Sequence, residues 1–161
     1  GRTPEYLGNK IETREIKFAA LAILIHPLLI LFASAITIVS GNAAVSITNP
    51  GFHGLTQMIY EFTTTSANNG SEFAGFAGNT AYMNMLTGVV MFIGRYATII
   101  LLMAIAGSMA KKTKLEPSKG TFRTDNALFG VLFVSIIIIV GALTFFPALI
   151  LGAISEFLSL V

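Results

Sequence analysis

Long apolar stretches alternate with short polar ones along the 161-residue chain. Three of them are long enough to cross a bilayer as helices: residues 16–39, 81–110 and 127–151. At about 1.5 Å per residue each would extend roughly 35 to 45 Å, against a hydrocarbon core of about 30 Å. We therefore predict three transmembrane helices. The second is tilted or bent, because it is longer than the bilayer requires.

A shorter apolar segment, residues 54–66, lies between the first two. Its apolar side chains recur at helical spacing and share one face: Leu55, Met58, Ile59 and Phe62. A helix of about a dozen residues cannot cross a bilayer, but it suits a re-entrant half-helix that enters the membrane and stops midway. The alternative is an amphipathic helix that lies flat at the interface. The polar residues that follow favour re-entry.

The half-helix ends in small, uncharged polar residues. Its carbonyl end carries about half a negative charge and would point toward a cation. Backbone carbonyls can replace the hydration shell of an ion, and Gly70 permits backbone angles that larger residues resist. Asn68 and Asn69 can brace the loop or add amide oxygens, and no carboxylate occurs before Glu72, which favours a monovalent cation over Ca²⁺ or Mg²⁺. The sequence thus predicts a selectivity-filter loop at 67–71, which other, related loops must complete.

Two polar residues interrupt the long stretches. Arg95 lies near the middle of the second, where insertion scales assign an Arg a cost of roughly 2.5–3.5 kcal/mol, so we expect it to face the protein interior or water. It is either a fixed charge beside the pathway, limiting cation flow or holding a gating loop, or the partner of a carboxylate elsewhere in the protein. His26-Pro27 predicts a local kink rather than a metal ligand or a proton relay. Glu61, within the half-helix, faces either an outer vestibule or solvent.

Composition narrows the class of protein. Hydrophobic residues make up 54% of the chain and charged residues only 11%, against about 25% charged in ordinary soluble domains. This composition predicts an integral membrane protein, and a net charge of +2 gives no indication of nucleic-acid binding. With no Cys and two His, the chain has no metal-ligand spacing, and it lacks a phosphate-binding Gly-Lys-Ser/Thr motif. We expect no organic cofactor, no metal other than a transported cation and no catalytic residues.

Basic residues predict the orientation. Four lie before or at the very start of the first span, five follow the second, and none lies within 40–80. The two groups are Arg2, Lys10, Arg14 and Lys17, and Lys111, Lys112, Lys114, Lys119 and Arg123. By the positive-inside rule, segments 1–15 and 111–124 are cytoplasmic, the half-helix enters from outside, and the C-terminus ends outside. The chain opens on charged residues without Met, which predicts that it belongs to a longer protein.

Five blocks of residues resemble the KdpA family, the potassium-binding (A) subunits of bacterial Kdp potassium-transporting ATPases. In chain order they are GRTPEYLG at 1–8, ANNGS and FAG within 67–75, Gly94-Arg95, AIAGS at 104–108 and GALTFFPAL at 141–149. The blocks extend over essentially the whole chain, so the resemblance is specific. The chain resembles the C-terminal part of such a subunit.

The resemblance implies an all-α integral membrane fold. The family is similar to a superfamily of K⁺ transporters in which four repeats of helix, re-entrant pore helix and helix surround one filter. This chain would hold the fourth repeat and one additional C-terminal transmembrane helix. The remaining three repeats would complete the filter.

The resemblance also implies roles for residues. The backbone carbonyls of Asn68, Asn69 and Gly70 would bind K⁺, while Ala67 and Ser71 would support the filter. Arg95 would lie near the pathway beneath the filter, as a pathway or gating charge.

The implied assembly is a P-type ATPase complex in the bacterial plasma membrane. This subunit would be non-catalytic, with ATP hydrolysis in KdpB and with KdpC and KdpF as further partners. Two other functions compete with this hypothesis. One is a repeat of a passive or ion-coupled K⁺ channel or transporter of the same superfamily; the other is a structural membrane adaptor with an interfacial helix. The five blocks favour the ATP-driven complex over both.

Overall fold

The computed structural model describes residues 5–114 and 124–161, and within the last helix it leaves the side chains of 144–149 and 151 undescribed. Arg2, Lys119 and Arg123 of the basic groups therefore lie outside the described residues. The elements, in order, are β1 Glu5–Tyr6, β2 Asn9–Lys10, α1 Thr13–Val39, the 3₁₀ helix η1 Asn42–Val45, α2 Phe52–Ser66, α3 Ala81–Ala110 and α4 Ala127–Ser159.

Local capping fixes where the long helices begin. Glu12 and Glu15 form a capping box at the start of α1. The Thr80 hydroxyl accepts from the Met83 amide at 3.1 Å and begins α3. Asn126 caps α4 by accepting from an amide of its first turn at 2.8 Å. Each cap satisfies an amide that the helix itself leaves unpaired.

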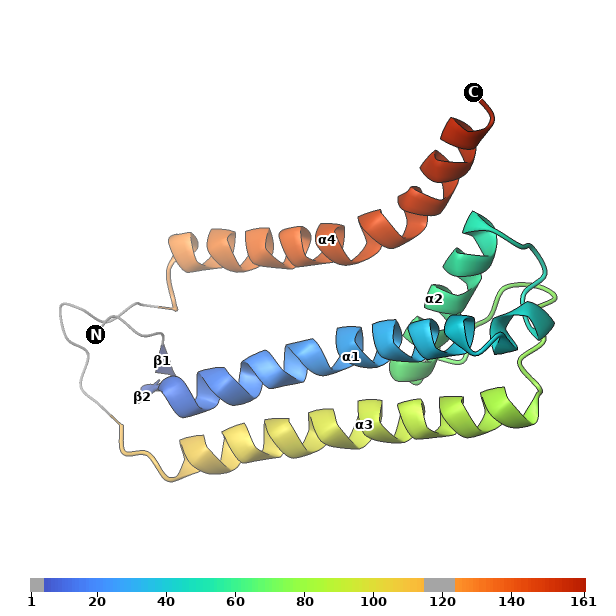
Figure 1. Cartoon of the computed structure of the whole chain (residues 1–161). Helices are drawn as coiled ribbons and strands as arrows, with labels where there is room; N and C mark the ends of the chain where they lie inside the picture. The colour runs from blue at the N-terminus through green and yellow to red at the C-terminus, as the bar shows by residue number, and fades with distance from the viewer. Residues whose placement is uncertain (1–4, 115–123) are drawn as a thin grey trace.

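Helices α1 and α3 run side by side in opposite directions, and both are long and apolar enough to cross a membrane (Figure 1). In the structure α3 occupies the range expected for the second span, and α1 begins three residues before the first. Helix α4 continues to Ser159, beyond the expected end at 151. The helical fold class is confirmed, and membrane crossing by these helices stays a prediction.

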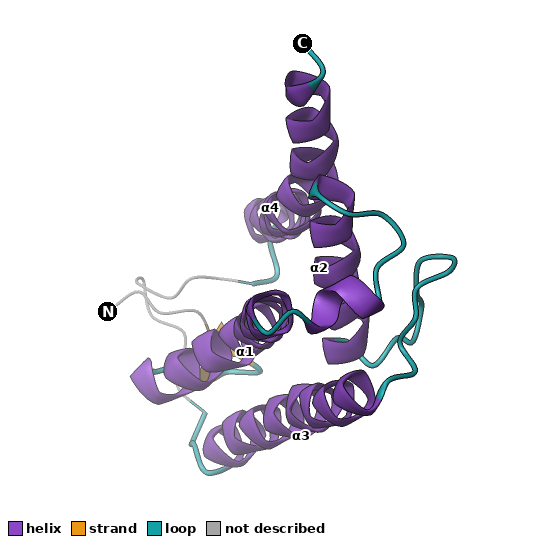
Figure 2. Ribbon diagram, turned by 45° about the vertical axis from the view of Figure 1, so that its right-hand side comes forward, coloured by secondary structure: helices purple, strands orange, loops and turns teal. Residues whose placement is uncertain are grey.

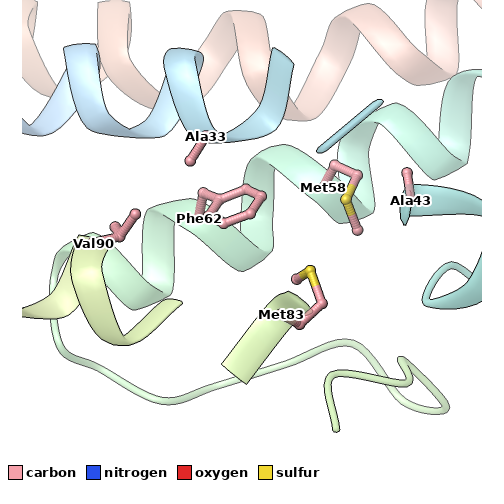
Figure 3. Close-up of a cluster of buried hydrophobic side chains, with 6 residues drawn as sticks. All are labelled: Ala33, Ala43, Met58, Phe62, Met83 and Val90. Carbon is pink, nitrogen blue, oxygen red and sulfur yellow. The ribbon is translucent and has the colours of Figure 1, made fainter. Parts of the chain in front are cut away.

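Helix α2 packs between α1 and α3. Met58 and Phe62, two of the four residues expected on its apolar face, are fully buried, whereas Leu55 is 46% exposed. The small core around them lies at the junction of the three helices (Figure 3) and consists of Ala33, Ala43, Met58, Phe62, Met83 and Val90. Burying apolar area from both long helices against α2 holds the short helix at its angle between them.

Helix α4 makes its main contact with α2. It bends part-way, and beyond the bend it meets the N-terminal part of α2 (Figures 1 and 2). A Cβ added at Gly152 would lie 2.6 Å from the Thr56 hydroxyl, so the absence of a side chain permits this close approach. His53 and Glu156 form a side-chain hydrogen bond in the same contact.

Lys112 links α3 to α1 at the opposite end of the structure. Its Nζ lies 2.8 Å from the Glu15 carboxylate and 3.1 Å from that of Glu12, and it donates to the Lys10 carbonyl at 2.8 Å. Burial alone would lower the pKa of Lys112, but the hydrogen bonds to the two carboxylates raise that pKa above its ordinary value. The second residue after the end of α3 is thereby tied to the start of α1.

Candidate cation-binding turn

Helix α2 ends at the middle of both long helices. Its last residue, Ser66, contacts His26, the fourteenth of 27 residues in α1, and Gly94, the fourteenth of 30 in α3. A Cβ at Gly94 would lie only 2.5 Å from the Ser66 carbonyl oxygen. The turn that follows α2 therefore begins about halfway along the pair of long helices.

The chain leaves α2 through a Schellman motif. The Asn68 amide donates to the Thr65 carbonyl at 3.0 Å, and the Asn69 amide to the Thr64 carbonyl at 2.9 Å. Asn68 takes the left-handed conformation that this motif requires, with φ of +56°. The last carbonyls of α2 are therefore occupied by the turn itself. Local turn bonds satisfy these carbonyls, and the expectation that this end of the helix faces a cation stays a prediction.

Three carbonyls that belong to the turn itself differ from those of the helix. Within the described residues, no group donates a hydrogen bond to the carbonyls of Asn68, Asn69 or Gly70. Gly70 has φ of +83°, and a Cβ built there would have nothing within 4 Å. Two positive φ angles in three residues turn the chain sharply while leaving its oxygens available. Such an arrangement can coordinate a cation without a carboxylate.

Ser71 ties the return of the turn to α2. Its amide donates to the Thr64 hydroxyl at 2.9 Å, and its own hydroxyl lies 2.8 Å from the Tyr60 hydroxyl. The ring of Phe73 lies 4.7 Å from that of Tyr60, centroid to centroid. At the other side, the Ala67 amide donates to an α2 carbonyl at 3.0 Å, and its side chain is exposed. Both ends of the turn are anchored.

The Asn68 side chain links the turn to α3. Its amide nitrogen donates to the Ser66 and Met91 carbonyls, each at 3.3 Å. In an α-helix the Met91 carbonyl also accepts from the Arg95 amide, so Arg95 lies one helical turn from this contact. The Arg95 and Asn69 side chains are exposed, and neither forms a hydrogen bond or ion pair with a described residue.

The structure adds a residue that the sequence analysis did not place near the turn. His26 Nδ1 lies 2.7 Å from the Ser66 hydroxyl, and its Nε2 lies 3.3 Å from the Thr98 hydroxyl. Helix α1 continues through Pro27, so the expected kink does not end it. The sequence did show a His in an otherwise apolar stretch. Its partners could not be predicted, because they lie 40 and 72 residues away along the chain.

Glu61 is buried rather than solvated. Its side chain is 5% exposed, one oxygen accepts from the Thr65 hydroxyl at 3.1 Å, and the other has no partner among the described residues. It borders a cavity of about 420 Å³ together with Glu72. The solvent-facing alternative for Glu61 is wrong. In residues 5–114 and 124–161, no group of three or more acidic or His side chains is placed to hold a metal ion.

Comparison with known proteins identifies the family. The family model for KdpA, the potassium-transporting ATPase A subunit, matches residues 1–158. The chain belongs to the KdpA family. Two curated relatives, both named potassium-transporting ATPase potassium-binding subunit, come from Caldanaerobacter subterraneus and Clostridium acetobutylicum. They are 68% and 54% identical over 160 residues, which is 99% of this chain and 28% and 29% of theirs. The chain spans less than a third of their length.

The resemblance to KdpA that the sequence suggested is therefore confirmed. One of its five blocks, 67–75, begins at the turn, and Ser66, the residue before it, contacts Gly94 of a second block, 94–95. Two of the five blocks therefore adjoin the turn, on the loop and on α3, and the other three lie elsewhere in the chain.

Proposed function

We propose that the carbonyls of Asn68, Asn69 and Gly70 bind K⁺, as one quarter of a selectivity filter in a KdpA-type potassium-binding subunit. The observation that carries this proposal is the placement of three consecutive carbonyls, which accept no hydrogen bond from any described residue, at the end of a short helix and halfway along two helices that could each span a membrane. Ala67 and Ser71 hold the two ends of this filter segment. In this proposal the chain is the fourth repeat of the subunit and one further transmembrane helix.

Helix α2 acts as a re-entrant pore helix. The connections before and after it are joined, because the Ala77 amide donates to the Ser46 carbonyl at 2.9 Å. Gly75 also lies close to Thr48, whose methyl would be 3.0 Å from an added Cβ. The segment therefore begins and ends at the same end of the two long helices, while its tip reaches their middle. This is the geometry expected of a re-entrant segment. A flat interfacial helix would not place its last residue against the middle of α1 and α3.

The filter delivers K⁺ to an ATP-driven uptake complex. The relatives' name, potassium-binding subunit of a potassium-transporting ATPase, supports this role. KdpB supplies ATP hydrolysis, KdpC and KdpF complete the complex, and three further repeats of the same subunit close the filter. Arg95, one turn from the Asn68 contact, provides a positive charge beside the pathway. The complex lies in the bacterial plasma membrane, with the Lys-rich loop at 111–124 cytoplasmic and the filter entered from outside.

Gly70→Asp in the complete subunit tests the filter. At φ of +83° the new side chain strains the turn and adds a carboxylate beside the carbonyls, so we expect the KM for K⁺ to rise at least about tenfold. Gly41→Asp is the matched control, since Gly41 has φ of +76° and equally open surroundings but lies outside the turn. K⁺-dependent ATP hydrolysis by the purified complex measures both. An unchanged KM in Gly70→Asp would favour a structural adaptor.

The runner-up function is a passive or ion-coupled K⁺ pathway. Uptake of K⁺ by proteoliposomes that contain the complex separates it from the ATP-driven one. We expect uptake only with ATP and an active KdpB. Uptake that persists with a catalytically inactive KdpB would support the passive alternative.

A further inference from the structure

His26 contacts the two other helices that meet at the filter turn. Its imidazole projects from the middle of α1, is partly buried, and reaches Ser66 at the end of α2 and Thr98 on α3. Ser66 itself is 1% exposed, so its hydroxyl has no access to water to replace this partner.

The hydrogen atoms in this group can be assigned from its partners. The Thr98 hydroxyl donates its one hydrogen to the Gly94 carbonyl at 3.0 Å, so toward His26 it can only accept. Nε2 of His26 must then carry the hydrogen. In a neutral imidazole Nδ1 is then the acceptor, and the Ser66 hydroxyl donates to it. The chain of donation runs from Ser66 through His26 and Thr98 to Gly94.

This series of hydrogen bonds and the Gly94 contact hold the end of α2 from two sides. Gly94 brings α3 against the Ser66 carbonyl, and His26 holds the Ser66 hydroxyl from α1. The Schellman motif then fixes Asn68 and Asn69 relative to the same last turn. A shift of Ser66 would therefore move the filter carbonyls with it.

We infer that His26 is a positioning residue for the K⁺ filter: its imidazole sets the depth and orientation of Ser66, and through Ser66 those of the carbonyls at 68–70. This inference rests on the proposed function. His26 does not contact the ion. Its function depends on two ring nitrogens, one toward Ser66 and one toward Thr98, that form hydrogen bonds which an apolar side chain of similar size cannot form.

The test compares His26→Leu with His26→Gln in the complete subunit within its complex. Leu removes both hydrogen bonds and strands the Ser66 hydroxyl, so we expect the KM for K⁺ to rise about tenfold, with kcat of K⁺-dependent ATP hydrolysis within about twofold of wild type. Gln restores a donor and an acceptor, and we expect it to keep the KM within about threefold. Discrimination of K⁺ over Na⁺ should fall in His26→Leu alone.

Ser66→Ala identifies the route of the effect. We expect it to raise the KM as His26→Leu does, and the double variant His26→Leu/Ser66→Ala to be no worse than either single one, because both remove the same bond. Additive effects would overturn the inference. So would a wild-type KM and Na⁺ discrimination in His26→Leu, or a reduced yield of complex with an unchanged KM in the protein that remains.

Gly70→Asp separates failure of this inference from failure of the proposed function. If Gly70→Asp raises the KM and His26→Leu does not, the filter stands and the role of His26 is overturned. If Gly70→Asp leaves the KM unchanged, the filter itself is overturned, and the positioning role with it.

Discussion

At the scale of single residues, backbone conformation matters more to this site than side-chain chemistry. Asn68 and Gly70 both have positive φ, and the oxygens that they leave free belong to the main chain. Asn tolerates the left-handed region better than most residues, and Gly adopts it at no steric cost. The chemistry of the turn is thus set by which residues can adopt these angles.

Replacing Asn68 separates its backbone role from its side-chain role. Asn68→Gly keeps the left-handed conformation and loses only the side-chain bonds to Ser66 and Met91, so we expect the KM for K⁺ to stay within about threefold of wild type. Asn68→Ala loses the same bonds and adds strain of about 1 kcal/mol, and we expect a larger rise in KM. K⁺-dependent ATP hydrolysis measures both variants. An equal, large loss in the two would assign the function to the amide side chain instead.

At the scale of elements, close packing fixes the C-terminal end of α2. Its last residue lies against α3 at Gly94, and its core residues Met58 and Phe62 are completely buried. A short helix of this kind is marginal by itself and depends on tertiary contacts for its position. The depth of the turn is therefore a property of the contacts of α2 with α1 and α3.

Adding one methyl group to α3 tests this dependence. In Gly94→Ala the new Cβ meets the Ser66 carbonyl at 2.5 Å, so α2 must shift, and we expect a loss of about 1–3 kcal/mol of stability and a raised KM for K⁺. Gly88→Ala is the matched control on the same helix, since a Cβ there has nothing within 4 Å. Thermal unfolding of the purified complex and its KM measure the difference. If the two variants behave alike, the contact does not position α2.

The elements themselves could be predicted from the sequence, and their contacts could not. The apolar stretch 81–110 is a local signal, and in the structure α3 occupies that range. The pairing of His26 with Ser66 depends on how two helices meet in space, which periodicity does not encode. Likewise, the contact of Ser66 with Gly94 depends on how α2 packs against α3, whereas the Schellman bonds at the end of α2 are local. The roles of the filter residues and Arg95 stay predictions.

At the scale of the whole molecule, the helices leave large apolar surfaces uncovered. Side chains on the outer faces of α1, α3 and α4 are more than half exposed; examples are Leu31, Phe32, Phe92, Ile100, Ile138 and Leu143. Exposed apolar area of this extent marks contact with lipid or with other protein segments. This chain spans under a third of its relatives' length. Both lipid and further segments like those of the relatives are therefore expected against these faces.

Labelling of single cysteines tests the arrangement in the membrane, and the chain is suited to it because it contains no Cys of its own. Asn49 and Asn79 are exposed residues on either side of α2 and its return loop, and Thr113 is exposed beyond α3. In a complete subunit whose other cysteines have been replaced, we expect a membrane-impermeant maleimide to label Asn49→Cys and Asn79→Cys in intact cells. Thr113→Cys should react only after the membrane is permeabilised.

The three positions together distinguish re-entry from its alternatives. If α2 crossed the bilayer, Asn49→Cys and Asn79→Cys would lie on opposite sides, and only one would react in intact cells. If the chain were inverted, Thr113→Cys alone would react there. A flat interfacial helix gives the same pattern as re-entry, so Asn69→Cys provides the deciding position. At the tip of a re-entrant helix it should react slowly and be protected by K⁺, whereas at an open interface it should react as fast as Asn79→Cys with or without K⁺.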